Sequence, residues 1–243
     1  MMSGFPGQLR LGVPRNGQLI FFGDSAAEQA YGEALRRWES LGATLVEFDL
    51  EPFYETARLL YEGPWVAERY LVIRDLLASA PDSIHPVTRE ITAAGARLTA
   101  ADTFAALYRL QALRRTAERA FAGFDAMVLP TAPTAYTTAQ VLANPIELNS
   151  RLGTYTNFVN LLDLCGLALP AAMRPDGIPF GITLLAPAAS KAARRAGEVS
   201  TVPESPKIIT VPARAPPAAS APEPVAPVSG ADAAGKSRRS TSA

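Results

Sequence analysis

The order of elements in the first fifty residues most constrains the fold. Residues 8–13 form a short apolar segment with strand character, and residues 44–50, TLVEFDL, alternate apolar and polar side chains. Between them, Asp24-Ser25 followed by Glu28 has the spacing of a capping box and predicts the start of a helix. One helix between two strands at this spacing predicts a βαβ unit with parallel strands.

The rest of the first 188 residues supports an α/β fold. Residues 126–129 read as a buried strand, and the PTAPTAYT stretch after it is too rich in Pro and Thr to continue that strand. LALPAAM and FGITLLAP flank Pro175-Asp176-Gly177 and predict a β-hairpin. Further helices are predicted at residues 53–62, 64–79, 86–96 and 101–121. We therefore expect a mixed sheet flanked by helices.

Two sets of apolar residues recur at helical spacing, and we expect both to face the core. The first lies in the predicted helix 101–121 and comprises Phe104, Leu107, Tyr108 and Phe121. The second predicts another helix, ending at Gly166, and comprises Tyr155, Phe158, Val159 and Leu162.

The composition changes near residue 189. From there to Ala243 the chain consists largely of Ala, Pro, Ser and Arg, with few branched apolar residues. This composition favours a disordered tail with extended, polyproline-like segments. We expect one folded unit over residues 1–188 and a disordered tail over residues 189–243.

Composition also narrows the class of protein. The 243 residues are 48% hydrophobic with a formal net charge of zero, so no basic excess favours nucleic acid. No leader or membrane-spanning run is evident, and we expect no membrane partner and a cytoplasmic location. With one cysteine and one histidine we expect no metal, and without a Gly-rich phosphate loop no nucleotide or other cofactor.

Three residues resemble catalytic groups but have simpler interpretations. Ser25 stands at a helix start, where serine accepts backbone N–H bonds. His85 precedes Pro86 at another helix start, and no G-x-S-x-G motif accompanies it. Cys165 is expected on a helix face as a small core residue. We nominate no catalytic residue in this chain.

The stretch YEGPWVAER places Tyr61 and Arg69 on either side of Gly63-Pro64. In one straight helix the two residues would stand about 12 Å apart along the axis and roughly 80° apart around it. A break at Gly63-Pro64 resets the helix direction and allows both side chains to face one cleft. A guanidinium beside a phenol suits a small planar anion. The alternative is that Tyr61 packs in the core while Arg69 pairs with a surface carboxylate.

LYEGPWVAERY resembles the later half of the amidase domain of allophanate hydrolases, in the amidase-signature family. Five further stretches carry the same resemblance over about 180 residues: FFGD, PF at 52–53, FDAMVLPTAPT, GTYTNFVNLLDLCGLALPA and DGIPFGITLLAPA. The resemblance implies a partial amidase-signature fold and hydrolysis of allophanate to ammonia and carbon dioxide in urea degradation. It also implies that Tyr61 and Arg69 bind the substrate carboxylate.

The family uses a serine–cis-serine–lysine triad, and no position of this chain matches it. The only lysines are Lys191, Lys207 and Lys236. We therefore expect the chain to be inactive alone and to need another chain that supplies the catalytic half. The alternative is a noncatalytic remnant or a small-anion-binding module.

Overall fold

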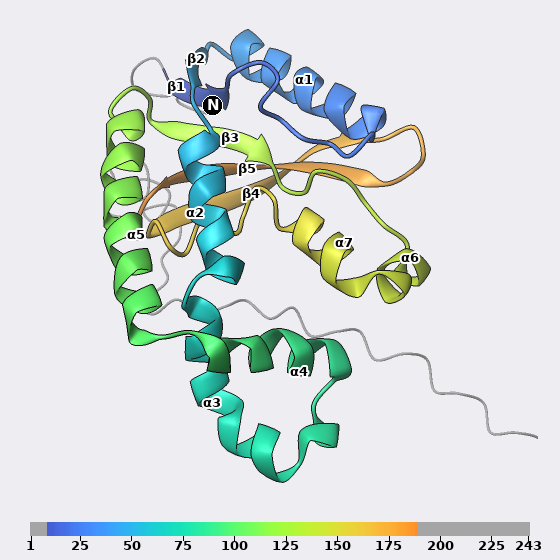
Figure 1. Cartoon of the computed structure of the whole chain (residues 1–243). Helices are drawn as coiled ribbons and strands as arrows, with labels where there is room; N and C mark the ends of the chain where they lie inside the picture. Colours follow the sequence, from blue (N-terminus) through green and yellow to red (C-terminus); the bar gives the residue numbers. More distant parts are fainter. Residues whose placement is uncertain (1–8, 189–243) are drawn as a thin grey trace, which may run out of the picture. The chain divides into compact units, whose positions relative to one another are not determined.

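The computed structural model describes residues 9–188, apart from the side chain of Glu62, and contains a five-stranded mixed sheet flanked by helices (Figure 1). The strand order is β2-β1-β3-β5-β4. The strands are β1 (Arg10–Pro14), β2 (Thr44–Phe48), β3 (Ala126–Pro130), β4 (Leu164–Met173) and β5 (Pro179–Pro187). The α-helices are α1 (Ser25–Ser40), α2 (Glu51–Glu62), α3 (Trp65–Ser79), α4 (Pro86–Ala93), α5 (Ala100–Phe121), α6 (Thr138–Ala143) and α7 (Pro145–Leu152). Short 3₁₀ turns occupy Pro81–Ser83 and Ala94–Arg97.

Both predicted strand pairings are confirmed. β1 pairs with β2 in parallel across α1, as the βαβ pattern predicts, and β3 joins the other side of β1 in parallel. β5 runs antiparallel to β3, and β4 and β5 form the predicted hairpin. The α/β class with a mixed sheet is therefore as expected.

The centre of the sheet is buried on both faces, as β3 shows, because all five of its residues are buried. Ala126 and Val128 belong to the apolar cluster that includes α1. Met127 and Leu129 belong to the opposite cluster, which includes residues of α2 and α5. Side chains of a strand alternate between faces, so one continuous apolar segment serves both layers.

The start of α1 corrects the predicted cap. Asp24, rather than Ser25, is the N-cap, and its carboxylate accepts the Ala27 N–H at 3.0 Å. Ser25 is the first residue of the helix. Asp and Ser are about equally good caps, so the sequence alone does not show which of these two adjacent residues is the N-cap. At α5 the predicted pair is correct, since Thr99 and Asp102 form a reciprocal capping box.

The predicted break between α2 and α3 is confirmed. α2 ends at Glu62, Gly63 has an extended backbone, and Pro64 is the N-cap of α3. A Cβ atom at Gly63 would collide with the Leu59 carbonyl oxygen and approach the Trp65 ring. The turn therefore requires glycine as well as proline.

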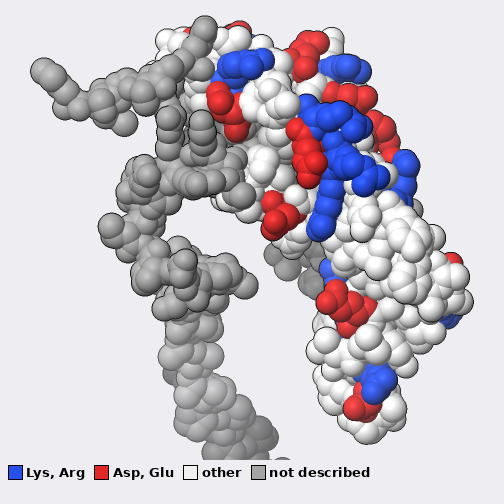
Figure 2. Space-filling model, turned by 90° about the vertical axis from the view of Figure 1, so that its left-hand side faces the viewer, with Lys and Arg blue, Asp and Glu red and all other residues white. Residues whose placement is uncertain are grey.

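The structure corrects both predictions that were made from apolar residues at helical spacing. Phe104, Leu107 and Tyr108 are 57%, 41% and 67% exposed, because α5 turns Leu110, Leu113 and Ala117 toward the core instead. Figure 2 shows, on the face that includes α5, a broad region without charged side chains beside a cluster of Arg and acidic residues. Of the predicted stripe, only Phe121 packs against the core.

The second repeat does not form a helix. Tyr155 and Phe158 are buried as expected, but residues 153–163 form successive turns. β4 then begins at Leu164, so Cys165 lies in a strand, where its thiol donates to the Ala186 carbonyl oxygen at 3.3 Å. The helices α6 and α7 were not predicted. The expected tail, residues 189–243, lies outside the described residues. No described helix is long and apolar enough to cross a membrane.

Candidate substrate-binding site

Tyr61 and Arg69 lie next to each other across the α2–α3 break. The Arg69 guanidinium carbon is 5.9 Å from the centre of the Tyr61 ring, within the range of a cation–π contact. Tyr61 is 43% exposed and Arg69 is also exposed, so Tyr61 is not a core residue. The break thus brings together two side chains that a straight helix would have separated.

Arg69 is the charged residue of this pair. Among the side chains that the structure describes, none forms an ion pair with Arg69. The guanidinium is exposed and presents a planar fork of N–H groups. A planar carboxylate is the acceptor that matches this fork.

Tyr61 also lines a cavity of about 480 Å³ beside α2. The other lining residues are Gly17, Gln18, Ile20, Glu51, Tyr54, Ala57, Arg58, Ser150, Thr154 and Asn157. Arg69 is not among them. The cation that lines this cavity is Arg58, whose guanidinium pairs with Glu51 at 2.7 Å. Arg58 and Tyr61 are three residues apart and share one helix face.

Two tyrosines, the buried Tyr155 and the half-buried Tyr54, fix the wall of this cavity. The Tyr155 hydroxyl accepts the Ile20 N–H at 2.8 Å and donates to the Ile20 carbonyl oxygen at 2.9 Å. The Tyr54 hydroxyl donates to the Gln18 carbonyl oxygen at 2.9 Å. Phenols are protonated at neutral pH, and burial raises the pKa of both further above that range, so both hydroxyls keep the protons that they donate.

Gln18 is held in turn by its own side chain. Its amide nitrogen donates to Asp49 at 2.7 Å, and its amide oxygen accepts the Leu50 N–H at 2.9 Å. The loop that precedes α1 is therefore fastened to the start of α2, and the cavity wall does not depend on the ligand for its shape.

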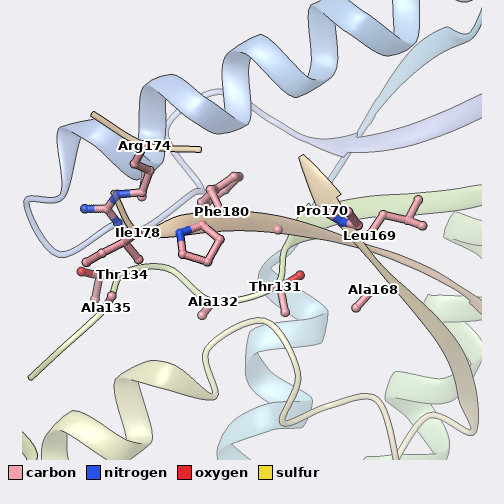
Figure 3. A pocket seen from close by; sticks show the side chains of 13 residues that line it. Thr131, Ala132, Thr134, Ala135, Ala168, Leu169, Pro170, Arg174, Ile178 and Phe180 are labelled. Carbon is pink, nitrogen blue, oxygen red and sulfur yellow. The ribbon is translucent and has the colours of Figure 1, made fainter. Parts of the chain in front are cut away.

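A second hollow, of about 360 Å³, lies beside the loop that follows β3 (Figure 3). Arg174 and Thr134 stand at one end of it, and Ala168 stands at the other. Most of its other lining residues are apolar or small: Ala27, Ala132, Ala135, Leu169, Pro170, Ile178, Pro179, Phe180 and Gly181, together with Thr131.

Arg174 anchors this end of the molecule. Its guanidinium bonds Asp24 at 2.8 Å and Asp176 at 2.6 Å, and its side chain is only 8% exposed. Asp24 also accepts the Thr134 hydroxyl at 2.8 Å. Burial raises the pKa of Asp24, but the hydrogen bonds from Ala27, Thr134 and Arg174 outweigh it and hold the pKa below its ordinary value. The carboxylate therefore joins α1, the loop after β3 and the hairpin turn.

The residues that resemble catalytic groups do not come together. Ser25 is in the first turn of α1, His85 is exposed before α4, and Cys165 is in β4. Among the described residues, no three His, Cys, Asp or Glu side chains are grouped as metal ligands. Within residues 9–188, these three residues therefore do not pair a nucleophile with a base.

Sequence reasoning missed most of the cavity. Only the lining residues of α2, among them Tyr54 and Arg58, had a local signal, because a helix places residues three, four or seven apart on one face. Gln18 and Asn157 reach the cavity from segments far apart in the chain, and nothing local to either residue indicates this.

Comparison with known proteins identifies the family of this chain. Residues 2–193 match the amidase family model. The chain belongs to the amidase family. It is 37% identical over 183 residues to the urea amidolyase of Lachancea kluyveri and 38% identical over 183 residues to that of Saccharomyces cerevisiae. Each match covers 74% of this chain but 10% of the relative, so the chain spans about a tenth of their length.

The fold is similar as well. The allophanate hydrolase of Kluyveromyces lactis superposes with a TM-score of 0.72 at 37% identity, over 76% of this chain and 30% of that protein. The partial amidase fold expected from the sequence is confirmed.

Proposed function

We propose that residues 1–188 form the substrate-recognition half of an amidase domain that hydrolyses allophanate in urea degradation, in the cytoplasm. Residues 189–243 would be a separate, disordered tail. The observation that carries the proposal is the pairing of Tyr61 with Arg69 across the Gly63-Pro64 break, beside the cavity that Tyr61 lines. Similarity to urea amidolyases and to an allophanate hydrolase supports the reaction class.

In this proposal Arg69 binds the carboxylate of allophanate through its fork of N–H groups, and Tyr61 donates its hydroxyl beside it. The carboxylate is what separates allophanate from urea or a neutral amide. A hydrogen bond to a charged group contributes roughly 1.5–3 kcal/mol. One such bond therefore gives about tenfold discrimination or more.

The proposed reaction is acyl transfer through a serine ester, followed by attack of water on that ester, with no metal or other cofactor. The serine–cis-serine–lysine triad would come from amidase sequence carried by another chain. The only lysines here are Lys191, Lys207 and Lys236, beyond the proposed domain. We therefore expect no allophanate turnover from the chain alone, and turnover above background by the pure protein would contradict this.

The second candidate is a noncatalytic small-anion-binding module. Arg69 is exposed and forms no ion pair with a described side chain, and this favours the module as much as it favours the enzyme. The two candidates differ when a triad-bearing amidase half is added: turnover supports the hydrolase, and anion binding without turnover supports the module.

Binding of malonamate, a stable carboxylated amide, tests the anion site. Calorimetry should show that the full chain binds malonamate and binds the neutral diamide malonamide at least tenfold more weakly. Arg69→Gln should remove that preference, and Tyr61→Phe should reduce it. Arg74→Gln is the matched control, since Arg74 lies on the same helix and pairs with Asp75 at 3.5 Å. Equal affinity of wild type and Arg69→Gln for malonamate would refute the site.

A further inference from the structure

The cavity that Tyr61 lines also contains an ion pair, which the proposed function leaves unexplained. Glu51 and Arg58 both line the cavity, and the Arg58 guanidinium donates to the Glu51 carboxylate at 2.7 Å. Their side chains are 59% and 50% exposed, so a ligand that enters the cavity can reach both charges. An exposed ion pair adds little to the stability of a fold, so its main effect here is on the ligand.

This ion pair makes the interior of the cavity electrically neutral. Among the described residues that line the cavity, Glu51 and Arg58 are the charged ones, and their charges cancel. Arg69 does not line the cavity and contacts Tyr61 from beside it. One positive charge therefore lies next to Tyr61, and a neutral ion pair lies further back along α2.

The spacing along α2 brings these groups within reach of one small ligand. Arg58 precedes Tyr61 by three residues, and residues three apart on a helix have Cβ atoms about 5–6 Å apart. A ligand whose carboxylate lies beside Tyr61 and Arg69 can therefore extend its other end to the ion pair. The cavity volume of about 480 Å³ is in the range of small-molecule sites.

A neutral amide suits the ion pair at that end. The hydrogen bond of the pair joins one guanidinium nitrogen of Arg58 to one carboxylate oxygen of Glu51. A guanidinium has several further N–H donors, and a carboxylate has a second oxygen. A primary amide has a carbonyl acceptor and an NH₂ donor group, so it can accept from Arg58 and donate to Glu51 while the pair stays intact.

A carboxylate in the same position is disfavoured. It has acceptors only, so it forms no hydrogen bond with the Glu51 carboxylate and is repelled by it. It also competes with Glu51 for Arg58, so the ion pair must open before the guanidinium can bind the ligand. Since like charges in contact cost free energy, the cavity disfavours a ligand with a carboxylate at each end.

We infer that Glu51, through its pair with Arg58, determines the specificity of the cavity. The cavity admits a ligand with one carboxylate and one amide, and it rejects the matching dicarboxylate. The inference rests on the proposed function for the position of the first carboxylate at Arg69. It adds the residue that distinguishes ligands by their other end.

Hydrolysis converts the favoured ligand into the disfavoured one. Water supplies the oxygen that bonds to the amide carbon, the C–N bond breaks, and the nitrogen leaves as ammonia. At neutral pH the new acid gives its proton to ammonia, so a carboxylated amide becomes a dicarboxylate and an ammonium ion. Glu51 therefore favours binding of the substrate and release of the product.

Calorimetry with malonamate and malonate, on the full chain at neutral pH, tests the inference. The two ligands differ in one end, which is an amide in malonamate and a second carboxylate in malonate. Wild type should bind malonate roughly tenfold more weakly than malonamate, because the second carboxylate meets Glu51. Glu51→Gln removes the charge and keeps the shape, so it should raise the affinity for malonate about tenfold. Glu51→Gln/Arg58→Gln should lose that gain.

Glu55→Gln is the matched control for Glu51→Gln. Glu55 lies on the same helix and pairs with Arg109, but it does not line the cavity. Its loss changes the net charge of the chain by the same amount and should leave the preference for malonamate unchanged. Thermal melting checks that each variant is folded.

Three results would each overturn the inference: equal affinity of wild type for the two ligands, no gain in malonate affinity in Glu51→Gln, or an equal gain in Glu55→Gln. Failure of the proposed function is a separate result, because it appears as equal malonamate affinity in wild type and Arg69→Gln. In the Arg69→Gln background, Glu51→Gln should still raise the affinity for malonate, since that gain needs only Arg58.

Discussion

At the scale of single residues, Asp24 has more partners than any group of the proposed anion site. Its carboxylate serves as the cap of α1, as the acceptor for Thr134 and as the partner of Arg174. Both side chains of the ion pair are nearly buried, at 8% and 12% exposure. Breaking such a pair leaves an uncompensated charge, so its loss costs more than that of a surface pair.

We predict that Asp24→Asn lowers the free energy of unfolding at neutral pH by roughly 1–3 kcal/mol. Because the folded-state pKa of Asp24 lies below its ordinary value, the carboxylate stabilises the fold above that ordinary value and loses its contribution as the pH falls through the folded pKa. The difference between wild type and variant should therefore shrink as the pH falls below 3.8.

Urea unfolding at a series of pH values measures this difference. Asp75→Asn is the control, because the Asp75 side chain is 96% exposed, and it should change stability by about 0.5 kcal/mol or less at any pH. A difference for Asp24→Asn that stays constant through the acid range would show that the ion pair does not act through the charge of Asp24.

At the scale of elements, the break between α2 and α3 determines whether the anion site exists. Gly63→Ala should lower the free energy of unfolding by about 1–3 kcal/mol, because the new Cβ collides with backbone at Leu59. It should also weaken malonamate binding, since any relief of the collision moves Arg69 relative to Tyr61. Thermal unfolding and calorimetry measure the two effects.

Gly32→Ala is the control for this change. Gly32 lies inside α1, and a Cβ there meets only Arg36 at an ordinary distance of 3.6 Å. Alanine at a helix interior should stabilise by about 0.5–1 kcal/mol and leave binding unchanged. Equal effects of the two substitutions would mean that the break tolerates a side chain and does not set the site.

The elements also show what could be predicted from the sequence. Signals that act within a few residues were correct: the capping box of Thr99 and Asp102, the break at Gly63-Pro64 and the β4–β5 hairpin. The apolar repeat at Tyr155 and Phe158 was predicted to be a helix but forms turns, and the Tyr155 hydroxyl bonds the backbone of Ile20, 135 residues away. A contact at that separation leaves no mark in local spacing.

The same limit applies to the candidate site. Tyr61 and Arg69 were predictable because they flank one local break, whereas Gln18 and Asn157 enter the cavity only once the sheet is assembled. Hydrophobic spacing likewise indicated that α5 has an apolar side but could not tell which part of it the core covers. The exposed side chains at the start of α5 are the result.

At the scale of the whole molecule, these exposed apolar surfaces predict that the chain associates with itself. The rings of Phe104 and Tyr108 lie side by side on the outside of α5, with centres 6.4 Å apart and planes tilted by 35°. Large exposed apolar patches on soluble proteins promote association. In sedimentation velocity, the sedimentation coefficient of the full chain should rise with protein concentration. The double variant Phe104→Ser/Tyr108→Ser should reduce that rise.

The control must change exposed apolar area without touching α5 or β4. Leu142→Ser, on α6, does so at a position that is 72% exposed, and it should sediment like wild type. If the double variant still associates while Ala168→Pro, in the edge strand β4, does not, the open edge of β4 rather than α5 drives self-association, because only the strand edge offers unpaired backbone donors. A wild-type chain that stays monomeric throughout the micromolar range would show that neither surface drives self-association.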